Sequence, residues 1–398
     1  MFGDKEGRGK IMSNKEMLLI PGPTPVVDEI YEALASETYA HTDPRFVKIF
    51  KNSLELTRKL FNTEGEVFVV SGSGTLAMEM AIINTVAPGE KLLVISHGYF
   101  GDRFVPLAKA FGVHVETLQA EWGQHIKKEL VEEKMAEGGF KAVTVTHVDT
   151  STGVVAHLEE LVPVVKKAGA LFILDGVCAA AAIEEDMQKT YGHPDYKLDL
   201  VFTGSQKAIG VPPGLAILAF GPKALAAREA MTSVLGYYAD IKNWITIMND
   251  PGKYYATPPV NMIYAFNRGM EIVQEEGLNH RYRRHVALGR AVRAGLGVYG
   301  MKPLAAEEVA APTLSCILYP EGVNDTEFRS RLAAKGMVIA GSLASLAGKA
   351  FRIGHMGNVT EEMFIKAIEL VGETLQEMGQ DADIGEAVAE FKNIYHSA

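Results

Sequence analysis

The sequence predicts an α/β protein with a large domain, in which a mainly parallel sheet lies between helices, and a smaller C-terminal α+β domain. Short apolar runs alternate with helix-like stretches from about residue 66 onward, which is typical of βαβ units. After Asn261 this alternation gives way to two long helical stretches and then to a mixed segment. The 398 residues are enough for two or three domains of roughly 100–200 residues each.

In chain order, the apolar runs predict strands, and the stretches with helical apolar spacing between them predict helices. The large-domain strands are expected at 67–70, 91–95, 113–118, 142–148, 170–175, 198–208 and 214–220, with helices at 76–86, 106–112, 126–137 and 158–169. Long helices at 262–277 and 280–300 follow, and then strands near 314–318 and 349–353. We therefore expect residues 26–280 to form the large domain and 281–398 the small one, with residues 1–25 joining the C-terminal part.

Composition excludes several classes of function. The formal net charge of -10 argues against a nucleic acid or an anionic membrane as partner. No apolar run approaches the ~18–20 residues of a membrane span, and residues 1–17 lack the apolar core of a signal peptide. Two cysteines suit a reducing compartment. A cytoplasmic protein is the expectation. No metal site is indicated, because the sequence has neither CxxC nor HExxH spacing and its histidines are scattered.

Polar residues follow several predicted strands and should meet at one edge of the sheet. The segment Ser71–Thr75, between a strand and a helix, has the glycines and the helix start of a phosphate cup. A tight turn with a Ser or Thr cap is an equally good interpretation of this segment alone. Asp175 closes an apolar strand and needs a cation or several hydrogen-bond donors, unless it is only a loop cap.

Two further features complete the pattern. Lys207 lies between apolar flanks, where an amine nucleophile and an ordinary lysine reaching for water are both possible. Tyr99 and Phe100 follow another strand and could stack on a flat ring, although a single aromatic is more often core. Taken together, a phosphate cup, an aromatic, a strand-end Asp and a Lys are the parts that hold pyridoxal phosphate.

Five segments give the chain a specific resemblance: VSGSGT, THVDTSTG, GSQKAIGVPPG, YYATPPV and FRIGHMG. With them it resembles the class V aminotransferases of pyridoxal-phosphate fold type I, from Leu18 to Phe351. Within that class it is similar to the alanine–glyoxylate and the serine–pyruvate or serine–glyoxylate aminotransferases. The resemblance implies transfer of an amino group from alanine or serine to glyoxylate or pyruvate, with pyridoxal 5'-phosphate as cofactor.

The resemblance also implies roles for individual residues. Lys207 would form the Schiff base, and Asp175 would pair with the pyridine nitrogen. The other cofactor contacts would be Ser73, Gly74, Thr75, Phe100, Thr150, Val177 and Gln206, with Phe100 where many relatives have Trp and Thr75 where many have His. Tyr254 and Thr257 would reach the phosphate of the neighbouring subunit, which implies a homodimer with shared active sites. Gly22 would line the substrate pocket and Arg352 would bind the substrate carboxylate.

Four other functions are compatible with parts of the sequence. A 2-aminoethylphosphonate transaminase would share the cofactor site and differ in its contacts to the substrate anion. A cysteine desulfurase needs a nucleophilic Cys on a loop, whereas Cys178 and Cys316 both lie in apolar surroundings. A nicotinamide-dependent dehydrogenase should have an acidic residue ~20 positions after the glycine turn, and the strand there ends in Ser96 and His97. A catalytically inactive binding module is disfavoured by the joint presence of the lysine, the aspartate and the arginine.

Arg45 is expected to form a salt bridge at a helix start.

Overall fold

A seven-stranded sheet forms the centre of the protein, which the computed structural model describes over residues 16–397. Its strand order is β2 (Glu66–Ser71), β10 (Leu215–Phe220), β9 (Leu200–Gly204), β8 (Leu171–Asp175), β5 (Phe140–Thr146), β3 (Lys91–Ser96) and β4 (His114–Gln119). Only β10 runs antiparallel to its neighbours, so the sheet is mainly parallel, as predicted. Every residue of β8, β9 and β10 is buried, which explains why these strands read as unbroken apolar runs.

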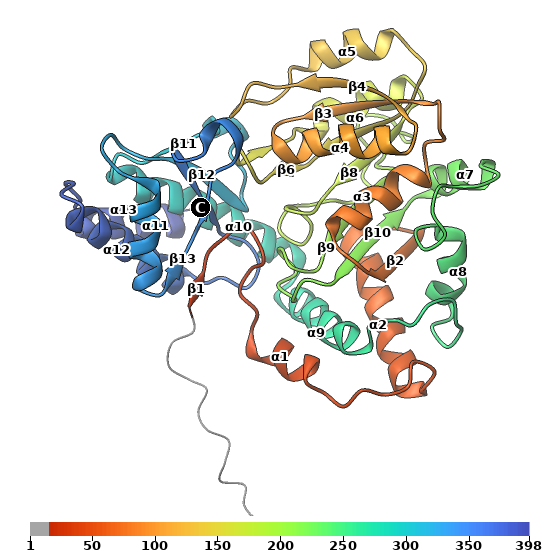
Figure 1. Ribbon diagram of the computed structural model, residues 1–398, viewed down its shortest axis with the longest axis horizontal. Coiled ribbons are helices and arrows are strands. Elements are labelled where there is room, and N and C mark those ends of the chain that lie inside the picture. Colours follow the sequence, from red (N-terminus) through yellow and green to blue (C-terminus); the bar gives the residue numbers. More distant parts are fainter. Residues whose placement is uncertain (1–15, 398) are drawn as a thin grey trace, which may run out of the picture.

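Helices surround this sheet (Figure 1). α3 contacts β9 and β10, α4 contacts β3, β4 and β5, and α6 contacts β8. The helices of this part are α1 (Asp28–Leu34), α2 (Pro44–Phe61), α3 (Gly74–Ile83), α4 (Tyr99–Ala110), α5 (Lys128–Ala136), α6 (Leu158–Lys167), α7 (Pro222–Ala230), α8 (Ile241–Asn249) and α9 (Val260–Glu276). α3, α5, α6 and α9 match the expected helices to within three residues at each end. α4 begins seven residues before the expected helix at 106–112, and α1, α7 and α8 have no counterpart among the expected helices.

The start of α2 shows how local sequence sets a helix boundary. The Asp43 side chain accepts a hydrogen bond from the Arg45 backbone N–H at 2.8 Å, and Pro44 stands at the first helical position. The Arg45 guanidinium also pairs with the Asp43 carboxylate at 2.8 Å. The predicted helix-start salt bridge is therefore confirmed. The helix ends at Asn62, which adopts a left-handed conformation with φ of 44°.

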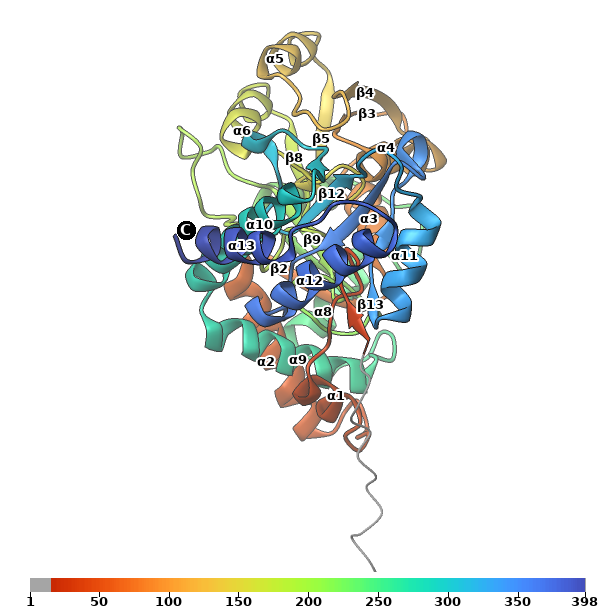
Figure 2. The same ribbon diagram turned by 90° about the vertical axis from the view of Figure 1, so that its left-hand side faces the viewer.

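The C-terminal part has its own hydrophobic core and lies to one side of the large sheet in Figure 1, so that it stands in front of this sheet in Figure 2. Its four-stranded sheet has the order β11 (Lys302–Pro303), β12 (Leu314–Leu318), β15 (Ala350–Gly354) and β14 (Ala340–Gly341). Its helices are α10 (Leu278–Val298), α11 (Asp325–Ala334), α12 (Glu361–Glu377) and α13 (Ile384–Ser397), with short 3₁₀ helices at Glu307–Val309 and Ala344–Leu346. Two further strands, β6 (Val148–Asp149) and β7 (Val154–Val155), form a hairpin after β5.

The start of the described chain packs on this C-terminal part. β1 (Met17–Leu18) pairs in parallel with β13 (Met337–Val338), and Leu19 belongs to the C-terminal core. We propose that the boundary between the two domains lies near residue 280. It would fall in the first turns of α10. The predicted N-terminal segment begins before this region, and its residues 1–15 lie outside the described chain. Among the described residues, no helix is long and apolar enough to cross a membrane.

A buried ion pair fixes the edge of the sheet opposite the strand ends that carry the predicted site. The Lys166 ammonium donates to the Asp199 carboxylate, and both side chains are almost fully buried. Asp199 also accepts from the Phe172 N–H at 2.7 Å, which ties the start of β9 to the start of β8. The pair thus holds α6 and two central strands together.

Replacing Lys166 with methionine is expected to destabilise the protein by about 3–5 kcal/mol, because a buried carboxylate is left without its cation. The same change at Lys167, its exposed neighbour on α6, is the matched control and should be nearly neutral. Denaturant unfolding followed by circular dichroism measures both variants. Equal midpoints for the two would show that the buried pair contributes no stability.

Candidate active site

A pocket at the carboxyl ends of the central strands gathers most of the predicted site residues. It lies where β5 and β8 end and where α3 begins, the edge at which ligands of parallel sheets bind. Nine predicted cofactor contacts line it: Ser73, Gly74, Thr75, Phe100, Thr150, Asp175, Val177, Gln206 and Lys207. These residues come from five separate loops or strand ends.

Asp175 is a buried carboxyl group at the end of β8, and no cationic side chain of the described residues forms an ion pair with it. Its Oδ1 accepts from the Val177 N–H at 2.9 Å, and its Oδ2 accepts from the Thr146 hydroxyl at 3.4 Å. Burial raises the pKa of this carboxyl from 3.8 to about 7, against the effect of the Val177 hydrogen bond. A positive charge in the pocket would restore the ionised form.

The first turn of α3 faces the same pocket. Ser73 occupies the N-cap position, but its hydroxyl makes no capping hydrogen bond. The first N–H groups of a helix have no acceptor within the helix, and the helix dipole adds positive potential there. Gly74 keeps the turn close to its neighbours, because a Cβ at this position would lie 3.1 Å from Val177 Cγ2. This turn can therefore bind an anion such as a phosphate.

Lys207 lies in the turn after β9 and contacts the N-terminal segment. Its ammonium donates to the Pro21 carbonyl, and its own carbonyl accepts from the Thr24 hydroxyl at 2.7 Å. Gly22 lies directly against the lysine, because a Cβ built there would be 2.6 Å from Lys207 Nζ. The φ of +110° at Gly22 is also one that L side chains rarely adopt. The structure thus brings Gly22 to the lysine, and its predicted part in lining the substrate pocket stays a prediction.

Arg352 reaches the pocket rim from β15 of the C-terminal part. Its Nε donates to the Gly341 carbonyl at 2.9 Å and its Nη1 to the Thr150 carbonyl at 3.4 Å. Thr150 itself lines the pocket. The guanidinium is half-buried and pairs with no carboxylate among residues 16–397, and burial lowers its pKa from 12.5. It remains a cation and can take a carboxylate from the pocket side.

Tyr254 and Thr257 do not line the pocket of their own chain. Both are exposed, and the Tyr254 side chain is 64% exposed. Their predicted contact with a cofactor belongs to a neighbouring subunit, which a single chain does not test.

Comparison with known proteins decides the family. The family described as Aminotransferase class-V matches residues 24–347. The chain belongs to the class V aminotransferase family. The resemblance to class V members and the predicted type I fold are thereby confirmed. The protein is an aminotransferase, and its cofactor is pyridoxal phosphate.

Individual relatives cover nearly the whole chain. An uncharacterized aminotransferase of Methanocaldococcus jannaschii is 37% identical over 93% of this chain and 95% of that protein. A serine–glyoxylate aminotransferase of Methylorubrum extorquens is 31% identical over 94% of each chain. The structure of an alanine–glyoxylate aminotransferase of Nostoc sp. is 27% identical, with a TM-score of 0.86 over 92% of this chain and 97% of that one.

The pocket of this class V aminotransferase fits the cofactor. The free first turn of α3 suits the phosphate, and the uncompensated Asp175 suits a protonated ring nitrogen. Gln206, next to the lysine, lines the pocket, and its side-chain amide N–H groups can donate to a phosphate. Val177 and Phe100 line the pocket with apolar surface. Polar groups that lack a partner of their own therefore lie where the phosphate and the ring nitrogen of pyridoxal phosphate would be held.

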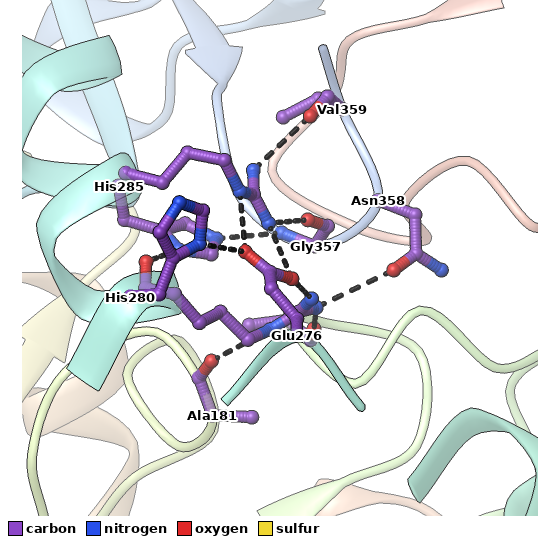
Figure 3. A network of polar contacts seen from close by, with 10 residues as sticks. Ala181, Glu276, His280, His285, Gly357, Asn358 and Val359 are labelled. Atoms are coloured by element: carbon purple, nitrogen blue, oxygen red, sulfur yellow. Dashed lines mark hydrogen bonds and ion pairs between the residues drawn. The ribbon is translucent and has the colours of Figure 1, made fainter. Parts of the chain in front are cut away.

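A network of charged residues supports the lysine loop of the aminotransferase (Figure 3). The almost fully buried Arg281 donates from Nη2 to the Ala208 carbonyl at 2.6 Å and pairs with Glu276. Arg284 pairs with the same carboxylate at 2.6 Å and donates to the Gly357 carbonyl at 2.9 Å. Through these contacts α10 fixes the residue that directly follows Lys207.

Asp149 was not among the predicted site residues, although it stands inside the THVDTSTG motif. This fully buried residue accepts from the backbone N–H groups of Phe100 and Gly101, both at 3.0 Å, and so fixes the start of α4. Its Oδ1 accepts from the Ser151 hydroxyl at 2.6 Å. The signal available was that Asp149 is the only acidic residue of this motif and follows closely after the apolar run of β5. Arg103, in the same turn as Phe100, also lines the pocket and was not predicted.

Proposed function

We propose that this aminotransferase moves an amino group from a small amino acid, alanine or serine, to a 2-oxo acid, glyoxylate or pyruvate. The position of Arg352 carries the proposal. Its guanidinium stands at the rim of the lysine pocket, where a substrate carboxylate would place the α-amino group near Lys207. The names of the Methylorubrum and Nostoc relatives support serine, alanine and glyoxylate as substrates.

Each of the proposed site residues would have a separate role in amino transfer. Pyridoxal phosphate, when bound, withdraws electrons from the substrate α-carbon and carries the amino group between the two substrates. Lys207 would hold the cofactor through its amino group and would move the proton at the substrate α-carbon. Asp175 keeps the ring nitrogen protonated, and the first turn of α3 with Ser73 and Gln206 anchors the phosphate. Arg352 orients the substrate through a bidentate contact.

A homodimer with shared active sites is part of the proposal. Tyr254 and Thr257 are exposed and lie outside the pocket of their own chain. Tyr237, in a nearby segment, is 79% exposed, so several large polar-aromatic groups face outward here. Such groups are enriched at protein interfaces. The cytoplasmic location also stays a proposal, resting on two cysteines that are both free and buried.

The desulfurase alternative is disfavoured by the state of the cysteines. Cys178 lines the pocket rather than only the core, but it is buried and burial raises the pKa of its thiol. Cys316 is buried within β12, and burial raises its pKa as well. Neither thiol has the exposure and the low pKa of a reactive cysteine. The 2-aminoethylphosphonate alternative shares the pocket, so only substrate tests separate it.

A substrate panel tests the proposal. Cofactor-loaded enzyme is mixed with alanine, serine, aspartate, cysteine or 2-aminoethylphosphonate, without an acceptor, and loss of the visible cofactor band is followed. Alanine or serine should convert the cofactor fastest, and glyoxylate or pyruvate should restore the band. Conversion by 2-aminoethylphosphonate alone, or release of sulfide from cysteine, would replace the proposal with the matching alternative.

Replacing Asp175 with asparagine should make the apoenzyme more stable and the cofactor-loaded enzyme less active. The buried, uncompensated carboxylate costs the apoenzyme stability, and this cost grows as the pH rises from 3.8 to about 7 and stays constant above it. The asparagine variant has no such cost, so its apoenzyme should melt at a higher temperature than the wild type above pH 7. The difference should shrink toward the ordinary pKa of the carboxyl.

The same variant should lose at least about 100-fold in turnover, because a neutral amide cannot hold the ring nitrogen protonated. Thermal melts of both apoenzymes across the pH range, with steady-state rates of the loaded forms, provide the measurement. A variant apoenzyme that is less stable at every pH would contradict this role for the carboxyl group.

A further inference from the structure

Two histidines and a glutamate meet outside the cofactor pocket. His125 lies in the loop between β4 and α5, His157 stands at the N-cap position of α6, and Glu160 is in the first turn of that helix. One ligand atom of each residue lies within 4.8 Å of those of the other two. His125 and His157 are far apart in the sequence, so their spacing there does not suggest a site.

The nitrogen and oxygen atoms of the three residues face one another. His125 Nε2 is 3.6 Å from one carboxylate oxygen of Glu160, and His157 Nδ1 is 3.6 Å from the other. Ligand atoms around a tetrahedral Zn²⁺ stand about 3.4 Å apart when each bond is about 2.0–2.1 Å long. The observed separations are therefore close to those of a metal site. The Glu160 side chain is 45% exposed, which leaves room for a water on the open side.

The histidine nitrogens have few other uses. Both nitrogens of His125 are buried and have no hydrogen-bond partner among the described residues. His97, at the end of β3, stacks on the His125 ring with centroids 5.2 Å apart and planes 9° apart. It is completely buried, and it fixes the plane of the His125 ring without being one of the three ligands.

His157 has the support that metal-bound histidines usually have. Its Nε2 is 3.2 Å from the Glu308 carbonyl, to which an Nε2–H can donate. In this tautomer Nδ1 carries a lone pair and faces the Glu160 carboxylate. Two hydrogen-bond acceptors, Nδ1 and a carboxylate oxygen, then face each other, and a cation between them would satisfy both. His157 makes no side-chain capping bond at its N-cap position, so helix capping does not account for the residue.

We propose that His125, His157 and Glu160 bind a divalent transition-metal ion, with Zn²⁺ as the preferred ion. Two imidazoles and a carboxylate are a common ligand set for Zn²⁺, with water in the fourth position. The site is separate from the amino-transfer pocket, and none of its three ligands lines that pocket. It takes no part in the proton transfers proposed above.

The site would join segments of both parts of the protein. The loop that carries His125 also accepts a hydrogen bond at the Gly123 carbonyl from the Ala306 N–H, at 3.1 Å. Ala306 and Glu308 belong to the segment before β12, in the C-terminal part. A metal ion held by this loop and by α6 would therefore stabilise the contact between the two parts. Bound Zn²⁺ should raise the melting temperature of the protein.

Metal binding is tested on tag-free, cofactor-loaded protein that has been stripped of metal with a chelator. Isothermal titration with Zn²⁺ should show one tight site per chain with micromolar or better affinity, and Zn²⁺ should raise the melting temperature. Co²⁺ in the same site should give the visible bands of a four-coordinate ion. Glu160→Gln and His157→Ala should each weaken Zn²⁺ binding by about 10–100-fold and abolish the thermal shift.

Glu159→Gln is the matched control, because it removes the same charge one residue away, at a side chain that is 67% exposed and pairs with Lys189. It should bind Zn²⁺ like the wild type. His193→Ala, at an exposed histidine, controls for weak surface binding. The proposal is overturned if wild-type protein takes up no Zn²⁺ in this range. It is equally overturned if Glu160→Gln and His157→Ala, shown to be folded by circular dichroism, bind as tightly as the controls.

Discussion

Replacing Lys207 with alanine is expected to abolish transamination while leaving a folded protein that still binds pyridoxal phosphate noncovalently. The first turn of α3, Gln206 and Asp175 line the pocket and would hold other parts of the cofactor, so losing one covalent bond should not empty the pocket. The lost proton transfer alone should lower the rate by about 100- to 10,000-fold. Steady-state rates with alanine and glyoxylate, together with retention of cofactor after gel filtration, measure the two effects.

Lys223→Ala is a suitable control, since this lysine is an exposed residue of α7 that donates to the Asp195 carbonyl at 3.4 Å and does not line the cofactor pocket. It should keep wild-type activity. The assigned role of Lys207 would be wrong if its alanine variant kept more than about a tenth of the wild-type rate, because a general base contributes more than that.

Replacing Arg352 with alanine is expected to lower kcat/KM for alanine by roughly 30- to 1000-fold, mainly through a higher KM. A charge-assisted bidentate contact left unmade in a half-buried site costs on the order of 2–4 kcal/mol. Arg352→Lys should recover little, because an ammonium group cannot offer the paired fork and would also lose the Nε contact to Gly341. The visible spectrum of the loaded enzyme should hardly change, since other residues hold the cofactor.

The comparison substrate is ethylamine, which is alanine without its carboxylate. Arg352→Ala should leave the low activity toward ethylamine unchanged. Arg331→Ala serves as the matched arginine control, because Arg331 is an exposed residue of α11 that pairs with Glu327. Equal losses for alanine and ethylamine, or no loss for either, would remove Arg352 from substrate binding.

Much of the large domain could be predicted from sequence, for a physical reason. Strands such as β8 and β10 are buried on both faces, so their side chains must be apolar throughout, and the runs stand out against the amphipathic helices. Polar residues directly after such strands, such as Asp175, must then lie at the carboxyl edge. This explains why nine residues chosen from sequence line one pocket.

Other features depend on contacts between distant segments, which local patterns do not encode. The predicted strand at 198–208 ends at Gly204, because the chain must turn there to place Lys207 against the N-terminal segment. Arg281 reads as one of several arginines on a long helix, and only the fold shows it buried against the Ala208 carbonyl. The meeting of His125 with His157 likewise requires the packing of a loop on α6.

The identity of the lysine that carries the cofactor tests the central claim most directly. The loaded wild-type enzyme is reduced with borohydride, digested and mapped by mass spectrometry. The proposed mechanism predicts the reduced cofactor on the peptide that contains Lys207, in close to one copy per chain, and no comparable label elsewhere. A label on any other lysine, with Lys207 unmodified, would contradict the assignment of this pocket as the site of amino transfer.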